Sequence, residues 1–304
     1  VLRSACGSLA DSASGPRESG ELSQHLAEGA RVEKAVHRRV QSQPELATRR
    51  FVLAGLIAVA PLALATPASA LQDSRTVSFE TRDGLTIQGD FTRPAHVQRL
   101  FPALILIHQG NTDRTEWRPF VPRLTVAGFA TLAYDIWGFG DSDPLPDPDI
   151  PWWEDPDAAP LDLEAALTFL RTIEGVDPDR VAVMGGSIGS NLAAMSTFRF
   201  SVRAAVSLSP NEPEMVGLSG VEDPAVRNAL YVAGTLDRDG LNAERARSLA
   251  DQTAGRADTI IVQGSPAHGV SLFAARSTLM DEVIEWLNAA LEARGPSVRL
   301  GRVR

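Results

Sequence analysis

Residues 180–194 read RVAVMGGSIGSNLAA, and this stretch decides the fold. A short apolar run predicts a buried strand, a glycine-flanked serine predicts a sharp turn, and the small and apolar residues that follow predict a helix. Gly-x-Ser-x-Gly between a strand and a helix is typical of a nucleophile elbow, which lifts Ser187 clear of the sheet. Gly185 and Gly189 suit such a turn, because it leaves almost no room for side chains.

Strand patterns recur on both sides of this stretch. Short apolar runs, typical of strands buried on both faces, occupy 103–107, 129–134, 204–208, 229–233 and 259–262. Ahead of them, β-prone runs at 77–80 and 85–91 flank Arg82-Asp83-Gly84, which predicts a hairpin. The chain should therefore begin its sheet with an antiparallel pair and continue with buried strands.

Helical spacing appears between the strands. Two apolar stripes have it: Leu163, Ala166, Leu167 and Leu170, and then Leu279, Val283, Leu287 and Leu291. Strands and helices that alternate in this way predict an α/β fold, with a mostly parallel central sheet, an antiparallel N-terminal hairpin and helices on both faces.

The composition fits a globular protein with an acidic surface. Of 304 residues, 44% are hydrophobic, and 38 acids against 29 bases give a net charge of −9. A negative surface repels phosphate backbones, so nucleic acid is not expected as a partner. Cys6 is the only cysteine, and the five histidines are not spaced like ligand pairs, so we expect no metal or other cofactor.

The N-terminal region carries an export pattern. Residues 49–70 read RRFVLAGLIAVAPLALATPASA, in which two arginines precede an apolar run and a small-residue cleavage site. Residues 48–70 therefore predict a twin-arginine-like signal peptide and export to the periplasm or outside the cell. The alternative is a membrane anchor over 51–72, although Pro61 and Pro67 interrupt it.

The rest of the chain divides around this segment. Residues 1–47 are polar and predict disorder or an over-extended N-terminus. Residues 71–293 predict a single folded domain, and 294–304 form a C-terminal tail. After cleavage of the signal, no stable membrane anchor is expected.

A serine hydroxyl needs a neighbouring base to act as a nucleophile. His268 is the only histidine after Ser187, and it follows the last predicted strand. Asp237 follows the strand at 229–233 and could orient the imidazole. Asp239 competes for that role, but it precedes the run LNAERARSLA, so we expect it to cap a helix.

Two loops supply candidates for the rest of the site. The backbone N–H groups of Ile188 and Gly110 are the expected oxyanion donors, with Gln109 as an alternative to Gly110, and His108 is expected to be structural. In the loop 143–160, Trp152 and Trp153 are candidates for a substrate pocket; the alternative is a rigid surface loop with a tryptophan packed underneath.

Together these segments resemble the serine α/β-hydrolases, particularly bacterial esterase-like members grouped with the dienelactone hydrolases. The resemblance rests on HQGNTDRTEW at 108–117, YDIWGFGDS at 134–142, VDPDRVAVMGGSIGSNLAA at 176–194, VAGTLD at 232–237 and PAHGVSLF at 266–273. It implies the α/β-hydrolase fold and a triad of Ser187, Asp237 and His268. Dienelactone hydrolases proper use cysteine as the nucleophile, so their substrate is not implied.

These observations predict a secreted serine hydrolase that cleaves a small-molecule ester through an acyl-enzyme. A thioesterase or a peptidase would use the same triad. A catalytically silent binding protein on the same fold is the alternative of a different class. The sequence indicates no oligomeric state.

Overall fold

The computed structural model describes residues 74–94, 100–145 and 151–292, all within one compact unit. The predicted N-terminal extension 1–47, the signal 48–70, the alternative anchor 51–72 and the tail 294–304 lie outside the described residues. Within the described ranges, no helix is long and apolar enough to cross a membrane.

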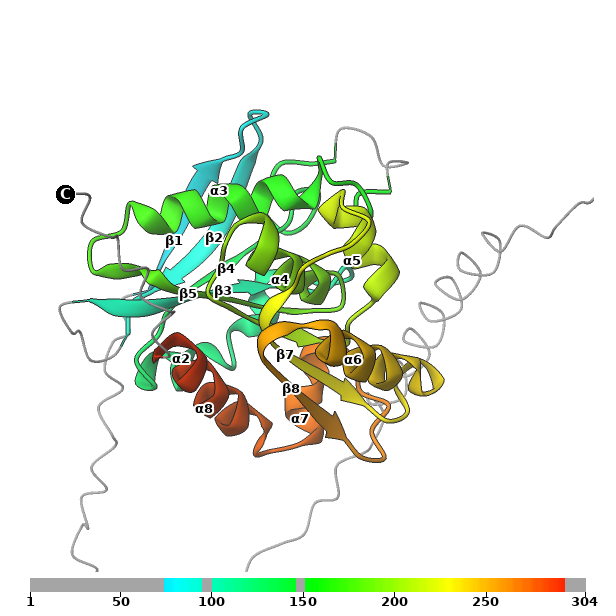
Figure 1. Cartoon of the computed structure of the whole chain (residues 1–304). Coiled ribbons are helices and arrows are strands. Elements are labelled where there is room, and N and C mark those ends of the chain that lie inside the picture. Colours follow the sequence, from blue (N-terminus) through cyan, green and yellow to red (C-terminus); the bar gives the residue numbers. More distant parts are fainter. Residues whose placement is uncertain (1–73, 95–99, 146–150, 293–304) are drawn as a thin grey trace, which may run out of the picture. The chain divides into compact units, whose positions relative to one another are not determined.

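Eight strands form one sheet in the order β1-β2-β4-β3-β5-β6-β7-β8 (Figure 1). The strands are β1 Ser74–Glu80, β2 Thr86–Thr92, β3 Phe101–Ile107, β4 Ala130–Tyr134, β5 Val176–Gly186, β6 Ala204–Leu208, β7 Arg227–Gly234 and β8 Ala254–Val262. Strand β2 pairs antiparallel with β1 and β4, and every other pair is parallel. The predicted hairpin and the mostly parallel sheet are confirmed.

Helices cover both faces of this sheet (Figure 1). The α-helices are α2 Val121–Val126, α3 Ala159–Arg171, α4 Ile188–Arg199, α5 Glu212–Ser219, α6 Leu241–Gln252, α7 Leu272–Ala275 and α8 Leu279–Glu292. Three short 3-10 helices are η1 Arg114–Trp117, η2 Asp237–Gly240 and η3 Gly269–Ser271. Both predicted apolar stripes are buried, one on α3 and the other on α8.

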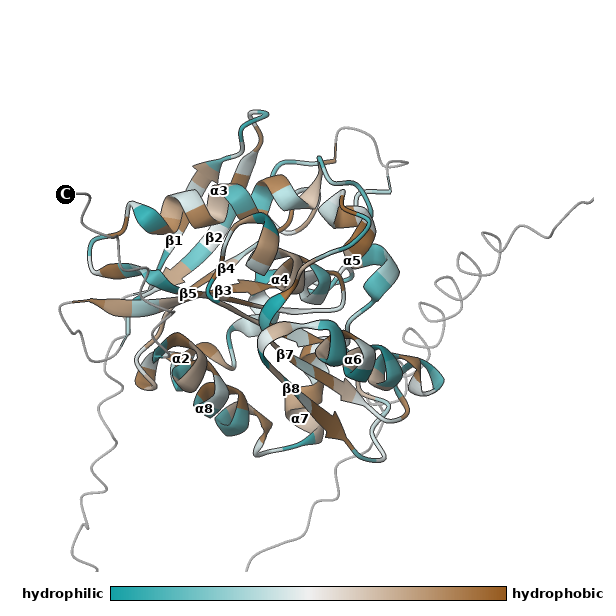
Figure 2. Ribbon diagram, viewed as in Figure 1, coloured by the Kyte–Doolittle hydropathy of each residue, from teal (hydrophilic) through white to brown (hydrophobic). Residues whose placement is uncertain are grey.

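The alternation of side chains along the strands produces two hydrophobic cores. In β3, Ile105 belongs to the core shared with α3, α4, α5 and α6, whereas its neighbour Leu104 belongs to the core shared with α2, α7 and α8. Hydropathy follows the same arrangement, because apolar residues gather on the strands and on parts of the helices (Figure 2). A strand between two apolar layers explains the unbroken run of apolar residues in β3.

The parallel direction of the central strands decides where loops meet. The segments after β3, β5, β6, β7 and β8 all leave the carboxyl edge of the sheet. These segments begin at or near His108, Ser187, Ser209, Thr235 and Gln263. In open α/β sheets, ligands bind at this edge.

Candidate active site

Ser187 lies in the turn between β5 and α4. Its φ of 53° and ψ of −118° are sterically unfavourable for a residue with a side chain. Such backbone strain costs about 1–3 kcal/mol and persists only where neighbouring structure enforces it. Here Ser187 N–H donates to the Leu208 carbonyl at 3.0 Å, and the Ser187 carbonyl accepts from Ser190 Oγ at 2.6 Å.

The glycines on either side make this turn possible. A Cβ on Gly185 would lie 2.2 Å from the Gly189 carbonyl oxygen, and a Cβ on Gly189 would lie 2.5 Å from the Ile107 carbonyl oxygen. Both distances are far below van der Waals contact, so each position excludes every larger residue unless the backbone moves. The turn brings β5 and α4 close together and places Ser187 at the carboxyl edge of the sheet.

The structure pairs the predicted acid with the predicted histidine. His268 Nδ1 lies 2.9 Å from Asp237 Oδ1 and 3.1 Å from Asp237 Oδ2. The loop of His268 is fixed in turn, since His268 N–H donates to Ser271 Oγ at 3.0 Å. Because Nδ1 lies within hydrogen-bond distance of the Asp237 carboxylate, we assign the ring proton to Nδ1, and Nε2 carries the free lone pair.

Asp239 takes no part in this pairing. It is exposed, with a φ of 57°, while Asp237 is buried. The expectation that Asp239 caps the next helix is wrong: the N-cap of α6 is Gly240, in the left-handed conformation, and no side chain caps that helix. The left-handed turn through Asp239 and Gly240 brings the chain into α6 without a capping carboxylate.

Two buried polar residues that the sequence analysis did not single out also bind Asp237. Ser209 Oγ donates to Asp237 Oδ2 at 2.6 Å, and Asn242 Nδ2 donates to the same oxygen at 2.9 Å. Burial opposes ionisation of Asp237, but hydrogen bonds from His268, Asn242 and Ser209 outweigh it and hold the pKa of this carboxyl below its ordinary value. Ser209 directly follows an apolar strand at the carboxyl edge of the sheet, and this position in the sequence could have marked it as a candidate site residue.

The hydroxyl of Ser187 is not hydrogen-bonded to His268 in this structure. Among the residues that the structure describes, its side-chain hydroxyl makes no hydrogen bond, either to His268 or to another group. Catalytic contacts of this kind are often long in unliganded enzymes and tighten when substrate binds. The structure thus shows a hydrogen-bonded Asp237–His268 pair without a hydrogen bond between Ser187 and His268 among the described residues.

The oxyanion loop, which is the loop expected to supply an oxyanion donor, follows β3 and comprises residues 108–113. Ile188 is the first residue of α4, so its N–H has no acceptor within the helix. A Cβ on Gly110 would lie 3.8 Å from Ile188 Cγ2, so the side chain of Ile188 lies next to Gly110. Gln109 N–H already donates a hydrogen bond to Glu116 Oε1 at 2.8 Å, so Gly110 N–H is the better candidate for an oxyanion donor.

Glu116 fixes the conformation of Gln109, and it too was absent from the sequence predictions. Its second oxygen accepts from Gln109 Nε2 at 3.0 Å. Burial raises the pKa of the Glu116 carboxyl, while the two hydrogen bonds from Gln109 oppose the rise. The Gln109 side chain also lies against Gly269, where an added Cβ would meet Oε1 at 2.1 Å. The oxyanion loop and the histidine loop are therefore in contact.

His108 is structural, as expected. It is fully buried; its Nε2 accepts from Ile136 N–H at 2.9 Å, and its Nδ1 lies 2.6 Å from the Gln109 carbonyl oxygen. Burial lowers the pKa of the His108 imidazole, so the ring stays neutral. Both ring nitrogens bind the backbone of the two loops, which leaves neither for chemistry.

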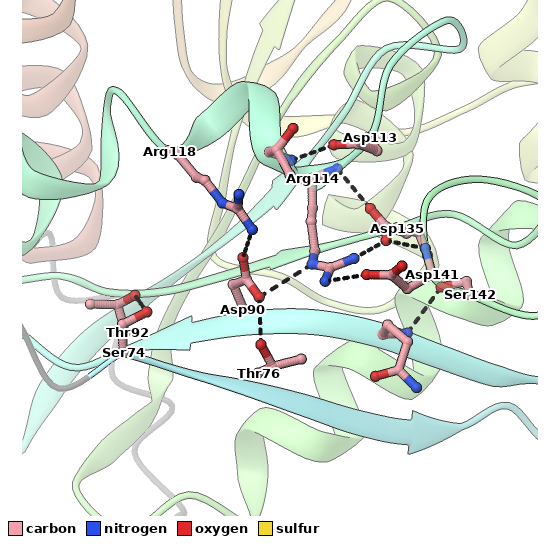
Figure 3. Close-up of polar contacts among 12 residues, drawn as sticks. Ser74, Thr76, Asp90, Thr92, Asp113, Arg114, Arg118, Asp135, Asp141 and Ser142 are labelled. Atoms are coloured by element: carbon pink, nitrogen blue, oxygen red, sulfur yellow. Dashed lines mark hydrogen bonds and ion pairs between the residues drawn. The ribbon is translucent and has the colours of Figure 1, made fainter.

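An ion cluster around the buried side chains of Arg114 and Asp135 lies at the start of η1 (Figure 3). Arg114 makes ion pairs with Asp135, with Asp141 at 2.7 Å and with Asp90 at 3.2 Å. Arg114 N–H also donates to Asp135 Oδ1 at 2.7 Å. Asp135 therefore belongs to the loop architecture and joins three chain segments beneath the oxyanion loop.

The two candidate pocket tryptophans differ in burial. Trp152 is 8% exposed and Trp153 is 39% exposed, and their rings meet edge to face at 5.9 Å. Carbon Cη2 of Trp152 lies 3.6 Å from where a Cβ on Gly110 would be. Trp152 thus lies beside the expected oxyanion donor, and Trp153 is the more accessible ring.

A metal-binding group or a hollow away from Ser187 could also mark a site in the described part of the chain. Within residues 74–94, 100–145 and 151–292, no group of three or more His, Cys, Asp or Glu side chains is placed to hold a metal ion. A hollow of about 640 Å³, lined in part by Leu167, Arg203 and Leu291, lies around the first residues of β5. That is the opposite edge of the sheet from Ser187.

Comparison with known proteins gives the class. A family model described as "alpha/beta hydrolase fold" matches residues 102–255, about half of the chain. The chain belongs to this family.

Particular relatives are more distant. The chain is 33% identical to thiohydrolase apmlB of Arthrinium phaeospermum over 124 residues, which cover 40% of this chain and 38% of that protein. An esterase of Pyrococcus furiosus superposes with a TM-score of 0.56 at 16% identity, covering 82% of this chain and 99% of that one. A dienelactone hydrolase of Anabaena variabilis superposes with a TM-score of 0.55 at 18% identity, covering 72% of this chain and 99% of that one. These likenesses support a hydrolase.

Proposed function

We propose that this protein is an exported serine hydrolase that cleaves ester bonds of small molecules, with Ser187, His268 and Asp237 as its catalytic triad. The observation that carries the proposal is the Asp237–His268 hydrogen bond at the sheet edge where the strained Ser187 turn emerges. A structural turn has no need of a strained serine and a buried acid–imidazole pair at the same edge. Perturbed acids and strained backbones cluster at functional sites.

The reaction follows from the protonation states. The Nδ1–H group of His268 keeps its proton and donates a hydrogen bond to Asp237, so Nε2 can accept the proton of Ser187 Oγ while that oxygen attacks the ester carbonyl. The backbone N–H groups of Ile188 and Gly110 stabilise the oxyanion. His268 then returns the proton to the departing alkoxide, and water attacks the acyl-enzyme by the reverse route to release the acid.

The acyl or alcohol group would pack against Trp152 and Trp153. Trp152 lies beside Gly110, and therefore borders the place where the carbonyl oxygen would bind. Its ring is supported from behind by Phe139, with ring centroids 5.2 Å apart. A rigid aromatic wall favours flat or extended apolar groups. In this proposal the exposed ring of Trp153 and the accessible edge of Trp152 contact the substrate.

A thioester is the second candidate substrate, because the relative from Arthrinium phaeospermum is a thiohydrolase. The same triad would serve either bond, as it would serve a peptide bond. Matched pairs of p-nitrophenyl esters and thiophenyl esters with the same acyl group, together with p-nitroanilides, distinguish these substrates. We expect the largest kcat/KM for the esters.

Covalent labelling tests the assignment of the nucleophile. The wild-type protein should react with a fluorophosphonate at Ser187, and Ser187→Ala should lose labelling and roughly 10³–10⁶-fold of kcat while staying folded. Ser201→Ala, which changes an exposed serine that also has a positive φ of 55°, is the matched control and should label normally. A wild-type protein that neither labels nor turns over any ester would favour a catalytically silent binding protein.

Export is tested separately. Secreted protein should begin near Leu71, and replacing Arg49 and Arg50 by lysine should retain the precursor inside the cell if the twin-arginine route is used. Mass spectrometry of the secreted fraction measures both outcomes. Unchanged secretion of the double variant would reject the route, and a product that keeps residues 51–72 would favour the anchor.

A further inference from the structure

Ser209 lies at the centre of the hydrogen bonds that join three loops of the site. It follows β6, is 2% exposed and has a φ of 62°. Its Oγ lies 2.6 Å from Asp237 Oδ2 and 2.8 Å from the backbone nitrogen of Gly269, the residue after His268. One buried hydroxyl therefore contacts both the acid and the histidine loop.

The direction of each bond is fixed by chemistry. A hydroxyl has one proton and two lone pairs, whereas a backbone N–H can only donate. Gly269 N–H must donate to Ser209 Oγ, so the hydroxyl proton is free to point at the Asp237 carboxylate. The bond to a charged acceptor is the stronger one, and burial leaves no room for water to replace it.

The backbone of Ser209 is itself anchored. Its N–H donates to the Val232 carbonyl at 2.7 Å, and the carbonyl of the preceding residue, Leu208, accepts from Ser187 N–H at 3.0 Å. Ser190 Oγ donates to the Ser187 carbonyl at 2.6 Å and lies 3.3 Å from the Ser209 carbonyl. The hydroxyl of Ser209 thus projects from a position that is tied both to the sheet and to the serine turn.

The contacts of Asn242 suggest a role for the Ser209 hydroxyl, which is to keep the Asp237 carboxylate from turning toward the Asn242 amide. Its Nδ2 lies 2.9 Å from Asp237 Oδ2 and 3.3 Å from His268 Nδ1, so the amide competes for the region between acid and imidazole. Without Ser209, Oδ2 loses its shorter contact, and the carboxylate is free to turn toward Asn242. The imidazole would then lose its fixed orientation.

We propose that Ser209 is a positioning residue for the reaction: it holds the Asp237 carboxylate and the His268 loop in one mutual orientation through a single hydroxyl. This inference rests on the proposed function, because orientation of the imidazole matters only if His268 acts as the base. It assigns Ser209 no contact with substrate. Its effect should therefore fall on kcat and leave KM nearly unchanged.

The positive φ allows backbone and hydroxyl effects to be separated. Ser209→Ala removes the hydroxyl and keeps the backbone penalty of a side chain, whereas Ser209→Gly removes both the hydroxyl and the penalty. The two variants should differ in stability, with glycine the more tolerated. If the hydroxyl is what positions the pair, the two variants lose the same activity.

The experiment uses the full chain with a p-nitrophenyl ester and the fluorophosphonate. Both Ser209 variants should lower kcat roughly ten- to a hundredfold, with KM changed by less than about twofold, and should slow labelling of Ser187 by a similar factor. Ser201→Ala and Ser201→Gly are the matched controls, because Ser201 is an exposed serine with a φ of 55°. They should change stability in the same sense and leave kcat unchanged.

The outcomes separate the two proposals. If the wild-type protein neither labels nor turns over, the proposed function fails. If it does both, and the Ser209 variants label at the wild-type rate, only the positioning role is overturned. If activity falls in Ser209→Ala but returns in Ser209→Gly, the backbone matters and the hydroxyl does not, which also overturns it. Should the alanine variant fail to fold, the glycine variant alone decides.

Discussion

On one side of Ser187, an ion cluster around the buried Arg114 and Asp135 follows the oxyanion loop. On the other side, the acid and histidine loops are joined by hydrogen bonds to a single carboxylate, that of Asp237. Arg114, 6% exposed, lies among three aspartates under the first loop (Figure 3). Asp237 accepts hydrogen bonds from a hydroxyl, an amide and an imidazole. The same sheet edge thus uses two kinds of support.

The difference matters because the two kinds of support fail differently. Removing one member of a buried ion cluster leaves an uncompensated charge away from water, which destabilises the whole fold. Removing a neutral donor from an ionised carboxylate leaves the remaining donors in place, so the fold loses less. We therefore expect the charged side to govern folding stability and the neutral side to govern reactivity.

The largest effect should come from Asp237→Asn. The amide favours the wrong imidazole tautomer, so kcat should fall by about 10⁴-fold while the unfolding midpoint changes little. Steady-state kinetics and thermal unfolding measure both. Asp239→Asn is the matched control, and it should remain active because Asp239 is exposed. An inactive Asp239 variant beside an active Asp237 variant would reverse the assignment.

Arg114→Gln should give the largest loss of stability. The free energy of unfolding should fall by about 3–5 kcal/mol, because Asp135 is fully buried and loses its guanidinium partner. The control is Arg118→Gln: Arg118 is 63% exposed and pairs with Asp90 at 3.2 Å, so its loss should cost about 0–1 kcal/mol. Urea unfolding compares the two, and equal losses would contradict the distinction between the two sides.

The two sides should also respond to acid in different pH ranges. Burial lowers the pKa of His108, so the folded ring stays neutral while the unfolded ring binds a proton below about pH 6.5. Stability from His108 is therefore complete above that pH and is lost as the pH falls, by at most about 1.4 kcal/mol per pH unit. The pKa of Asp237 is lowered too, so its contribution is lost only below about pH 4.

Urea unfolding at pH 7.5 and 5.5 tests this order. The wild-type protein should be less stable at pH 5.5, and His108→Gln should show a flatter dependence, since glutamine keeps a donor and an acceptor but does not titrate. Asp237→Asn should leave the slope in this range unchanged. If the histidine variant keeps the wild-type slope, another group is responsible.

Much of the architecture was predictable because its signals are local. Eight β-prone runs became the eight strands, and the Arg82-Asp83-Gly84 turn became the hairpin, because side-chain period and turn chemistry depend on near neighbours. The glycines around Ser187 were predictable for the same reason, since a tight turn excludes side chains within a few residues. The proximity of Asp237 and His268 was predictable because both follow parallel strands, which end at the same edge of the sheet.

What the sequence alone determined was therefore the fold class, the serine turn and the choice of Asp237 and His268 as neighbours. Only the tertiary structure decided which polar residues support the site. Ser209 and Asn242 bind Asp237, and Glu116 binds Gln109. Ser209 lies 28 residues from its partner, and the two nearer pairs depend on how their loops fold. The tertiary structure also decided that Gly240, rather than Asp239, is the N-cap residue of α6. The physical reason is that the identity of a polar residue gives only its donor and acceptor groups. Which group it binds depends on how separate segments of the chain pack together.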